Sequence, residues 1–157
     1  MDYISTRGQS PAVDSAQAVL SGLAPDGGLY MPGAIPAFDW QHCLALSAQQ
    51  MSAAILSALL PDIPNMDALV KRAYTGKFET EDLTPTVPVG DFQVLELFRG
   101  PTSAFKDVAL SMLPQLLTAA KQKKGIAQEI RILTATSGDT GKAALVGFQD
   151  VPGVSIC

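Results

Sequence analysis

A lysine heads an apolar row in the segment GPTSAFKDVAL, residues 100–110. Leu110, Leu113 and Leu117 recur at the spacing of one helical face, and the row continued toward the N-terminus ends on Lys106. No acidic residue stands one helical turn away from Lys106 on either side. Because an unpaired ammonium group is costly to bury, this position favours the uncharged amine, which is a nucleophile toward aldehydes such as pyridoxal phosphate (PLP).

Two further arguments bear on Lys106. In the first turn of a helix, the positive end of the helix dipole disfavours another positive charge. Asp107 does not pair with it easily, because adjacent helical residues point to different faces. The alternative is that Lys106 extends its amine to water from the helix end, as most lysines do. A second predicted apolar row runs beside the first, through Phe105, Ala109, Met112 and Leu116.

The loop TATSGDTGK, residues 134–142, is the second candidate for chemistry. Gly138 and Gly141 allow a tight turn and a close approach to a ligand. Amides at the start of the following predicted helix attract phosphate or carboxylate. Hydroxyl groups come from Thr136, Ser137 and Thr140. The same residues also fit an ordinary strand-to-helix loop in which Asp139 or Thr140 only caps the helix.

Several other kinds of site do not fit this sequence. A nucleotide P-loop would place its first glycine on Thr136 and its last hydroxyl on Ala143, and no G-x-G-x-x-G is present. His42 is the only histidine, so the chain cannot build a histidine-based triad or a histidine-rich metal site. Cys43 and Cys157 lack the spacing of zinc ligands. We therefore expect no metal site.

Charge and hydropathy exclude two classes of partner. The net charge is −4 and the isoelectric point about 4.8, which does not favour nucleic-acid binding. The one basic run, residues 121–124, falls where a helix ends and complements its dipole. No segment approaches the roughly 18 apolar residues of a membrane span, and MDYISTRGQS is not a secretory signal. We expect a cytoplasmic protein with a small-molecule substrate; the sequence leaves its oligomeric state open.

The elements that hold these candidates fall into two regions. Residues 1–83 predict a mainly helical region, in which Leu69, Val70 and Ala73 face inward. Its predicted helices cover residues 15–22, 39–60 and 66–76, after a short strand near residues 3–8.

Residues 84–157 predict alternating strands and helices. The strands are residues 86–89, 92–98, 131–136 and 154–157, and the helices residues 103–124 and 140–149, with Pro114 kinking or dividing the first. This order is typical of an α/β fold with a mostly parallel sheet and flanking helices. Three strands with two helices leave faces uncovered, so the chain is expected to be part of a longer protein.

Three segments together resemble threonine synthase, a fold-type-II PLP enzyme of the tryptophan synthase β-like class. They are SAQAVLSGLAPDGGLYMP (15–32), LELFRGPTSAFKD (95–107) and ILTATSGDTG (132–141). The resemblance implies that Lys106 is the catalytic lysine that holds PLP as a Schiff base. It also implies that Ser137, Gly138, Asp139, Thr140 and Gly141 help to bind the cofactor and the acidic groups of the substrate. Residues 84–157 would then be the first part of the PLP-binding domain.

The implied reaction converts O-phospho-L-homoserine and water to L-threonine and phosphate, a lyase reaction of amino-acid biosynthesis. The sequence departs from the family at Arg99, where a histidine is common. The family is also much longer, so we expect this stretch alone to bind PLP poorly and to be inactive. Two alternatives remain: a related PLP-dependent serine or threonine dehydratase, or a non-catalytic binding or assembly module that retains the fold.

Overall fold

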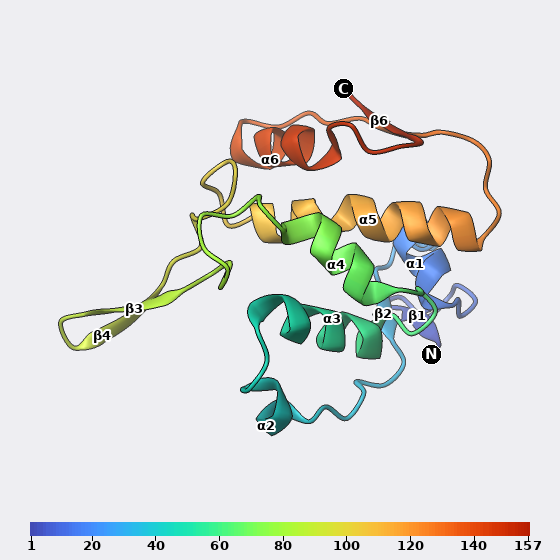
Figure 1. The fold of residues 1–157 in the computed structure, drawn as a ribbon. Helices are drawn as coiled ribbons and strands as arrows, with labels where there is room; N and C mark the ends of the chain where they lie inside the picture. The colour runs from blue at the N-terminus through green and yellow to red at the C-terminus, as the bar shows by residue number, and fades with distance from the viewer.

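The computed structural model describes all residues, 1–157. Helix α5 (Asp107–Lys123) runs through the middle of the molecule, with α6 (Asp139–Phe148) on one side and α1 (Ser15–Ser21) and α4 (Met66–Tyr74) on the other (Figure 1). Helix α3 (Ala48–Leu59) packs on α4, and the short α2 is Trp40–Cys43. None of the helices combines the length and apolar composition that a membrane crossing requires.

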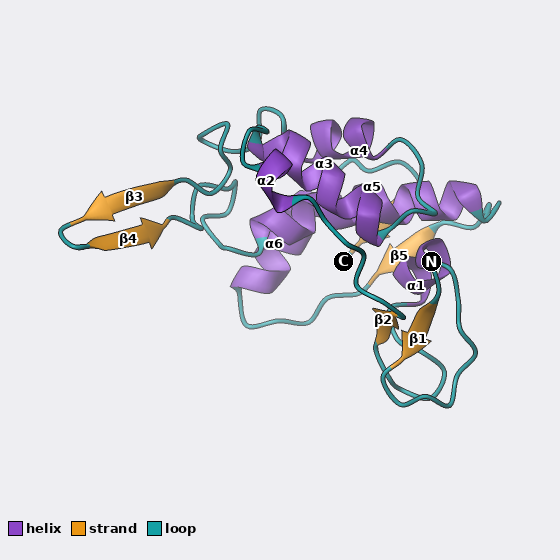
Figure 2. Cartoon of the chain, turned by 90° about the horizontal axis from the view of Figure 1, so that it is seen from below, coloured by secondary structure: helices purple, strands orange, loops and turns teal.

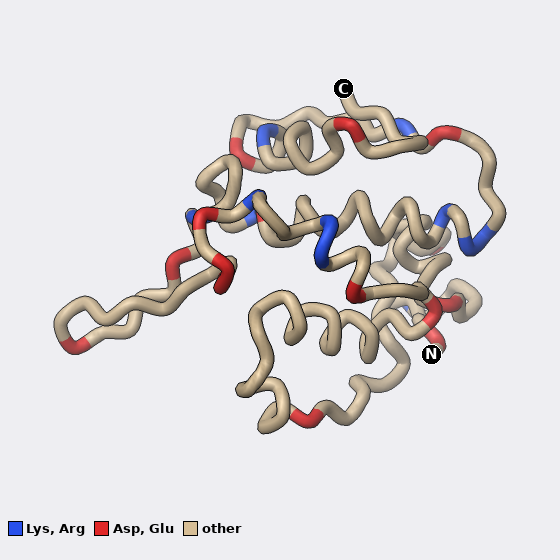
Figure 3. The backbone as a smooth tube through the Cα atoms, in the orientation of Figure 1, with Lys and Arg blue, Asp and Glu red and all other residues tan.

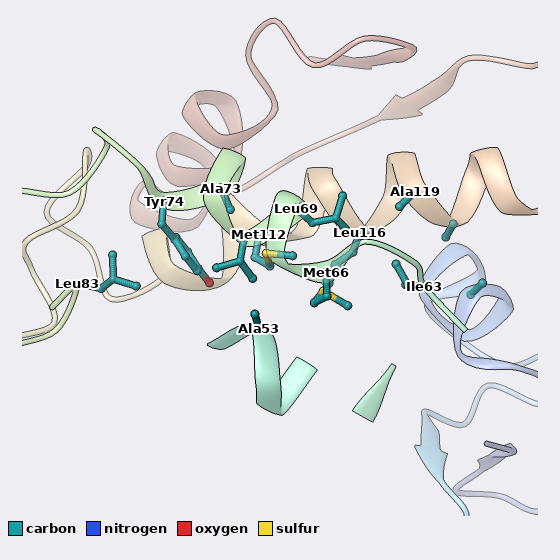
Figure 4. Packing of buried hydrophobic residues seen from close by; sticks show 13 residues of the cluster. Ala53, Ile63, Met66, Leu69, Ala73, Tyr74, Leu83, Met112, Leu116 and Ala119 are labelled. Atoms are coloured by element: carbon teal, nitrogen blue, oxygen red, sulfur yellow. The ribbon is translucent and has the colours of Figure 1, made fainter. Parts of the chain in front are cut away.

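The main hydrophobic core joins the predicted N-terminal region to α5. Leu69, Val70 and Ala73 are 3%, 1% and 0% exposed, which confirms the predicted inner face of α4. They belong to a cluster of 13 buried residues that also takes Met112 and Leu116 from α5. Figure 4 shows the α4 and α5 side chains pointing toward one another, with Ala53 of α3 below them. Helix α5 is thus anchored on the helices that precede it in the chain.

The single helix predicted over residues 39–60 is wrong, because the structure has two helices there. Ser47 caps α3: its hydroxyl accepts from the Gln50 amide, and the Gln50 side chain accepts from the Ser47 amide. This reciprocal capping box fixes a new helix start and leaves Leu44 73% exposed between the two helices.

Pro114 does not divide α5, which is continuous from Asp107 to Lys123. A proline cannot donate to the carbonyl four residues earlier, here that of Leu110. Gly147 of α6 lies against this carbonyl so closely that a Cβ there would overlap the oxygen. The proline is therefore accommodated where α6 crosses α5, and it is fully buried at that crossing.

The mostly parallel sheet is only partly found. Strands β5 (Ile130–Ile132) and β6 (Val154–Ile156) pair in parallel around α6, as predicted for a strand–helix–strand unit. Strand β4 (Phe92–Leu95) does not join them, because it pairs only with β3 (Thr86–Val89) in an antiparallel hairpin. A third pair, also antiparallel, links β1 (Tyr3–Ser5) to β2 (Tyr30–Pro32). The sequence pattern located the strands of residues 84–157 but not the sheets that they form.

The β3–β4 hairpin extends away from the helices in both views (Figures 1 and 2). Its turn is at Gly90, whose φ of +59° suits glycine. Large apolar side chains on it stay in contact with solvent: Phe92 is 74% and Leu95 53% exposed. An isolated two-stranded hairpin is only marginally stable in water. The two apolar side chains are therefore left without the packing that buries those of α4.

Candidate functional site

Lys106 lies at the N-terminal end of α5, which begins at Asp107 rather than at residue 103. The side chain is half-buried, and its amine lies 4.3 Å from the centre of the Phe105 ring. Phe105 itself is 61% exposed, and Ala109 is exposed too, so only Met112 and Leu116 of the predicted inner row are buried. The helix starts too late for its first residues to continue the apolar face.

The loop before α6 is organised by Thr136. Its hydroxyl oxygen accepts hydrogen bonds from the amides of Gly138 (3.1 Å) and Gly141 (2.9 Å). Gly141 approaches so closely that a Cβ would lie 2.8 Å from this oxygen, which explains the need for glycine. The Lys142 amide donates to the Gly138 carbonyl at the start of α6, which begins at Asp139. Thr136 therefore shapes the loop, which leaves other groups available for a ligand.

The two predicted candidates meet in one cavity. Lys106 and five consecutive loop residues line a pocket of about 300 Å³; the loop residues are Thr136, Ser137, Gly138, Asp139 and Thr140. Gly141 does not line it, but lines an adjoining cavity of about 520 Å³ that shares Thr136 and Gly138. The structure thus brings together Lys106 and four of the five predicted loop residues.

The lining of the Lys106 pocket is polar throughout. The expectation that leucines surround this amine was therefore wrong: Leu110 and Leu113 pack in a separate cluster with α6 and β6. The amides of Ser137, Asp139 and Thr140 form no hydrogen bond within the chain. Free amides at a helix N-terminus bind anions, and the Asp139 carboxylate attracts an ammonium group. The pocket suits a ligand that carries both charges.

Asp107 contributes a buried carboxylate that the sequence reasoning did not assign to the site. It is 2% exposed, and its Oδ1 accepts from the Thr102 hydroxyl at 2.6 Å. Its Oδ2 accepts from the Thr102 amide at 2.8 Å and, over 3.4 Å, from the Ala104 amide. The available signal was an aspartate five residues after Thr102 and three after Ala104, a short spacing that lets a side chain accept hydrogen bonds from a preceding turn.

Arg99 ties the base of the hairpin to the loop after α4. Its Nη1 lies 2.8 Å from Glu79 Oε2 and its Nη2 lies 2.6 Å from Glu96 Oε2. Hydrogen bonds to Glu79 and then to Glu96 raise the pKa of Arg99 above its ordinary value. Figure 3 shows acidic and basic segments gathered at this base. Arg99 does not line the Lys106 pocket, so its observed contacts connect segments of the chain.

Comparisons with known proteins agree on one family. Residues 2–74 match the family model described as "Threonine synthase N terminus". Threonine synthase from Methylobacillus glycogenes is 40% identical, over 99% of this chain and 35% of the relative. The crystal structure of PLP-bound threonine synthase from Brucella melitensis superimposes with a TM-score of 0.89 at 38% identity, covering 99% of this chain and 34% of that one. Yeast threonine synthase gives 0.87 at 36% identity, with the same two coverages of 99% and 34%.

The chain spans about a third of the length of the curated relatives it matches, since it covers 33–35% of each. The match to the family model ends with the last residue of α4, whereas the matches to relatives and solved structures continue over the Lys106 pocket. Residues 1–157 are therefore similar, in sequence and in fold, to about a third of the length of known threonine synthases.

Proposed function

We propose that residues 1–157 supply the cofactor lysine and part of the substrate pocket of a PLP-dependent threonine synthase. The reaction converts O-phospho-L-homoserine and water to L-threonine and phosphate. The observation that carries this proposal is the shared pocket of Lys106 and the loop 136–140, which unites segments 30 residues apart in the chain. In the same proposal, residues 84–157 form the first part of the cofactor domain and residues 1–83 a mainly helical support for it.

The residues present suit PLP. The cofactor is an aldehyde with a phosphate group, and the pocket offers a primary amine for the first. For an anionic group it offers three amides without an internal partner and the hydroxyls of Ser137 and Thr140. A volume of about 300 Å³ is at the lower limit for small-molecule sites, which fits one wall of a larger pocket.

Lys106 has two tasks in this proposal. Its amine holds the cofactor until substrate binds, and once displaced it takes protons from Cα and Cβ of the substrate and returns them. Bound PLP supplies the electron sink that makes these protons acidic and lets phosphate leave from Cγ. Water then adds at Cβ, and the two protons that Lys106 took are delivered at Cγ, which becomes the methyl group, and at Cα, so that threonine is complete. The position of Lys106 before an anchored helix keeps the amine within reach of the pocket.

The loop 136–140 orients the substrate. Amides of Ser137, Asp139 and Thr140, at the positive end of the α6 dipole, attract carboxylate or phosphate. The Asp139 carboxylate limits how much negative charge this wall holds, so further cationic groups from the rest of the enzyme are needed. For this reason we expect the 157-residue chain alone to bind PLP poorly and to turn over little, if any, substrate.

The test uses the longer enzyme of which residues 1–157 form the N-terminal third. Reduction of the PLP-bound enzyme with borohydride, followed by peptide mass spectrometry, should place the cofactor on Lys106. Lys106→Ala should abolish this label and lower kcat by at least about 100-fold, since general acid–base catalysis alone contributes that much. The control is Lys71→Ala, an exposed lysine of α4 that should keep both label and activity.

Substrate identity needs a separate measurement. Phosphate release and threonine formation from O-phospho-L-homoserine are compared with deamination of serine and threonine. Faster deamination would identify a dehydratase, and a label on a lysine other than Lys106 would refute the site.

A further inference from the structure

The chain has one fully buried ionisable side chain, and it belongs to Asp107, the residue after Lys106. A carboxylate removed from water is costly unless hydrogen bonds replace its hydration. All three donors to Asp107 come from one short segment directly ahead of the lysine, namely the Thr102 amide, the Thr102 hydroxyl and the Ala104 amide. The carboxylate therefore closes the segment 100–107 into a compact ring.

The ring includes a backbone conformation that is unfavourable by itself. Ser103 has a φ of +59°, a left-handed conformation that costs a residue other than glycine of order 1–3 kcal/mol. Gly100 packs so tightly on Asp107 that a Cβ there would overlap the Asp107 side chain. Thr102 and Ala104 are buried at 7% and 9% exposure. The bonds to Asp107 offset the strain at Ser103 and the burial of two amides.

Lys106 is one of the residues in this ring, and its backbone is held by the hydrogen bonds on either side. Ala104, two residues before it, and Asp107, directly after it, are bonded to each other through the carboxylate and through the Asp107 amide, which donates to the Ala104 carbonyl at 3.0 Å. The Lys106 carbonyl accepts the bond from the Leu110 amide at 2.8 Å at the start of α5. Its backbone is therefore fixed on both sides. Neighbouring residues on a helix point about 100° apart, so the carboxylate turns inward while the amine reaches the pocket.

Two ordinary roles for an aspartate do not account for Asp107. It forms no ion pair with Lys106, and both of its oxygens are occupied by the preceding turn. It does not cap the amides of its own helix, because its partners lie before that helix begins. Asp67, also in the first turn of its helix, is exposed and accepts no hydrogen bond from another residue. It is therefore the matched control.

We propose that Asp107 is a positioning residue for Lys106: its buried carboxylate clamps the turn 100–104 and thereby holds the amine at the wall formed by residues 136–140. This inference rests on the proposed function of Lys106. A displacement of about 1 Å at a reacting group can cost about 100-fold in rate, which sets the expected size of the effect.

The experiment compares four variants of the full-length PLP enzyme at a temperature where circular dichroism finds each of them folded. They are Asp107→Ala, Asp107→Asn, Thr102→Val and the control Asp67→Ala. Amide hydrogen exchange of residues 100–107 reports on the clamp without depending on the cofactor. The rate at which PLP is trapped on Lys106 by borohydride, and kcat and KM for O-phospho-L-homoserine, report on positioning.

Asp107→Ala is expected to speed exchange at Thr102 and Ala104, slow trapping and lower kcat about 100-fold with little change in KM. Asp107→Asn should lose less, because its amide oxygen can still accept from both backbone amides while its NH₂ group donates to the Thr102 hydroxyl oxygen. Thr102→Val removes one of the three bonds and should also have a smaller effect. These two variants decide the matter if Asp107→Ala does not fold.

Faster exchange with trapping and kcat within about twofold of the Asp67→Ala control would overturn the proposal, because the carboxylate would then be structural only. Unchanged exchange in Asp107→Ala would overturn it as well. If the wild-type enzyme carries no PLP on Lys106, the proposed function itself fails, and that result is recognised before any variant is compared.

Discussion

The molecule buries apolar side chains in two clusters of unequal size, a large one between α1, α3, α4 and α5 and a small one between α5, α6 and β6. In the large cluster Ala53, Met66, Leu69 and Val70 pack with α5 residues, and 13 residues are buried. The small cluster has only four buried residues, and large apolar side chains remain exposed next to β5, on α6 and on the β3–β4 hairpin. Examples are Phe92 at 74%, Leu133 at 78% and Leu145 at 48% exposure.

The two sides of the Lys106 pocket are attached to different clusters. Lys106 precedes α5, which is anchored in the large cluster, whereas the loop 136–140 joins β5 to α6 in the small one. Two-stranded sheets and a thin core give little stability by themselves. The Lys106 amine is thus attached next to a well-packed helix, whereas the loop facing it adjoins the small cluster. Relatives three times as long have additional residues available to pack on this loop.

A pair of leucine substitutions tests this difference most strongly. Leu69 is 3% exposed in the large cluster and Leu133 is 78% exposed next to β5. In residues 1–157, Leu69→Ala should lower the free energy of unfolding by about 2–5 kcal/mol, because it removes buried contacts and leaves a cavity. Leu133→Ala should change it by less than about 0.5 kcal/mol. Urea unfolding followed by circular dichroism measures both.

Equal costs for the two leucines would contradict the comparison. The same two substitutions can also be measured in the longer enzyme proposed above. If Leu133→Ala lowers the free energy of unfolding more there than in residues 1–157, the additional residues cover this side chain.

The crossing of α5 and α6 provides the next test, because α5 contributes to both clusters and α6 to the small one. Gly147 lies against the Leu110 carbonyl that Pro114 leaves without a helical partner. Gly147→Ala would force the helices apart, and overpacking of this kind typically costs about 1–3 kcal/mol. We expect lower stability by urea unfolding and faster amide exchange in residues 134–148. Leu145→Ala on the exposed side of the same helix is the control and should have neither effect.

Periodicity was sufficient where one helix face is buried along its whole length. The inner face of α4 follows from Leu69, Val70 and Ala73, which are buried as predicted. The loops of the pocket could also be identified, because glycines and hydroxyl residues at a strand-to-helix junction have a direct physical meaning.

Periodicity failed where a local side-chain bond or a missing neighbour decides the structure. The Ser47–Gln50 capping box ends the apolar pattern of residues 39–60, and Asp107 delays the start of α5 by fixing the turn before it. Strand pairing could not be predicted, because β4 carries apolar side chains that suit a buried sheet although this chain leaves them exposed. The prediction of apolar surroundings for Lys106 was wrong because the helix was assumed to begin about one turn too early. The apolar face of α5 therefore does not extend to this residue.

The smallest expected effect compares two aspartates, Asp26 in a turn near the N-terminus and Asp139 at the start of α6. Asp26 accepts from the Ser5 hydroxyl at 2.6 Å and from the Gly28 and Gln9 amides at 2.9 Å, whereas Asp139 accepts no hydrogen bond from another residue. The bond from Ser5, followed by those amides, lowers the pKa of Asp26 from 3.8 to about 2. A carboxyl group with a lowered pKa stabilises the fold above its unfolded-state value and loses that contribution as the pH falls through its folded-state value.

Asp26→Asn should therefore lower the urea midpoint of residues 1–157 above about pH 4, and the difference from wild type should shrink as the pH falls toward 2. Asp139→Asn should change the midpoint less than Asp26→Asn does, because no hydrogen bond from another residue holds its carboxylate. A midpoint difference for Asp26→Asn that stays constant or grows on acidification would mean that Ser5 and the two amides do not stabilise the ionised carboxylate. The hydrogen bonds to Asp26 would then stabilise the folded chain no more than the exposed carboxylate of Asp139 does.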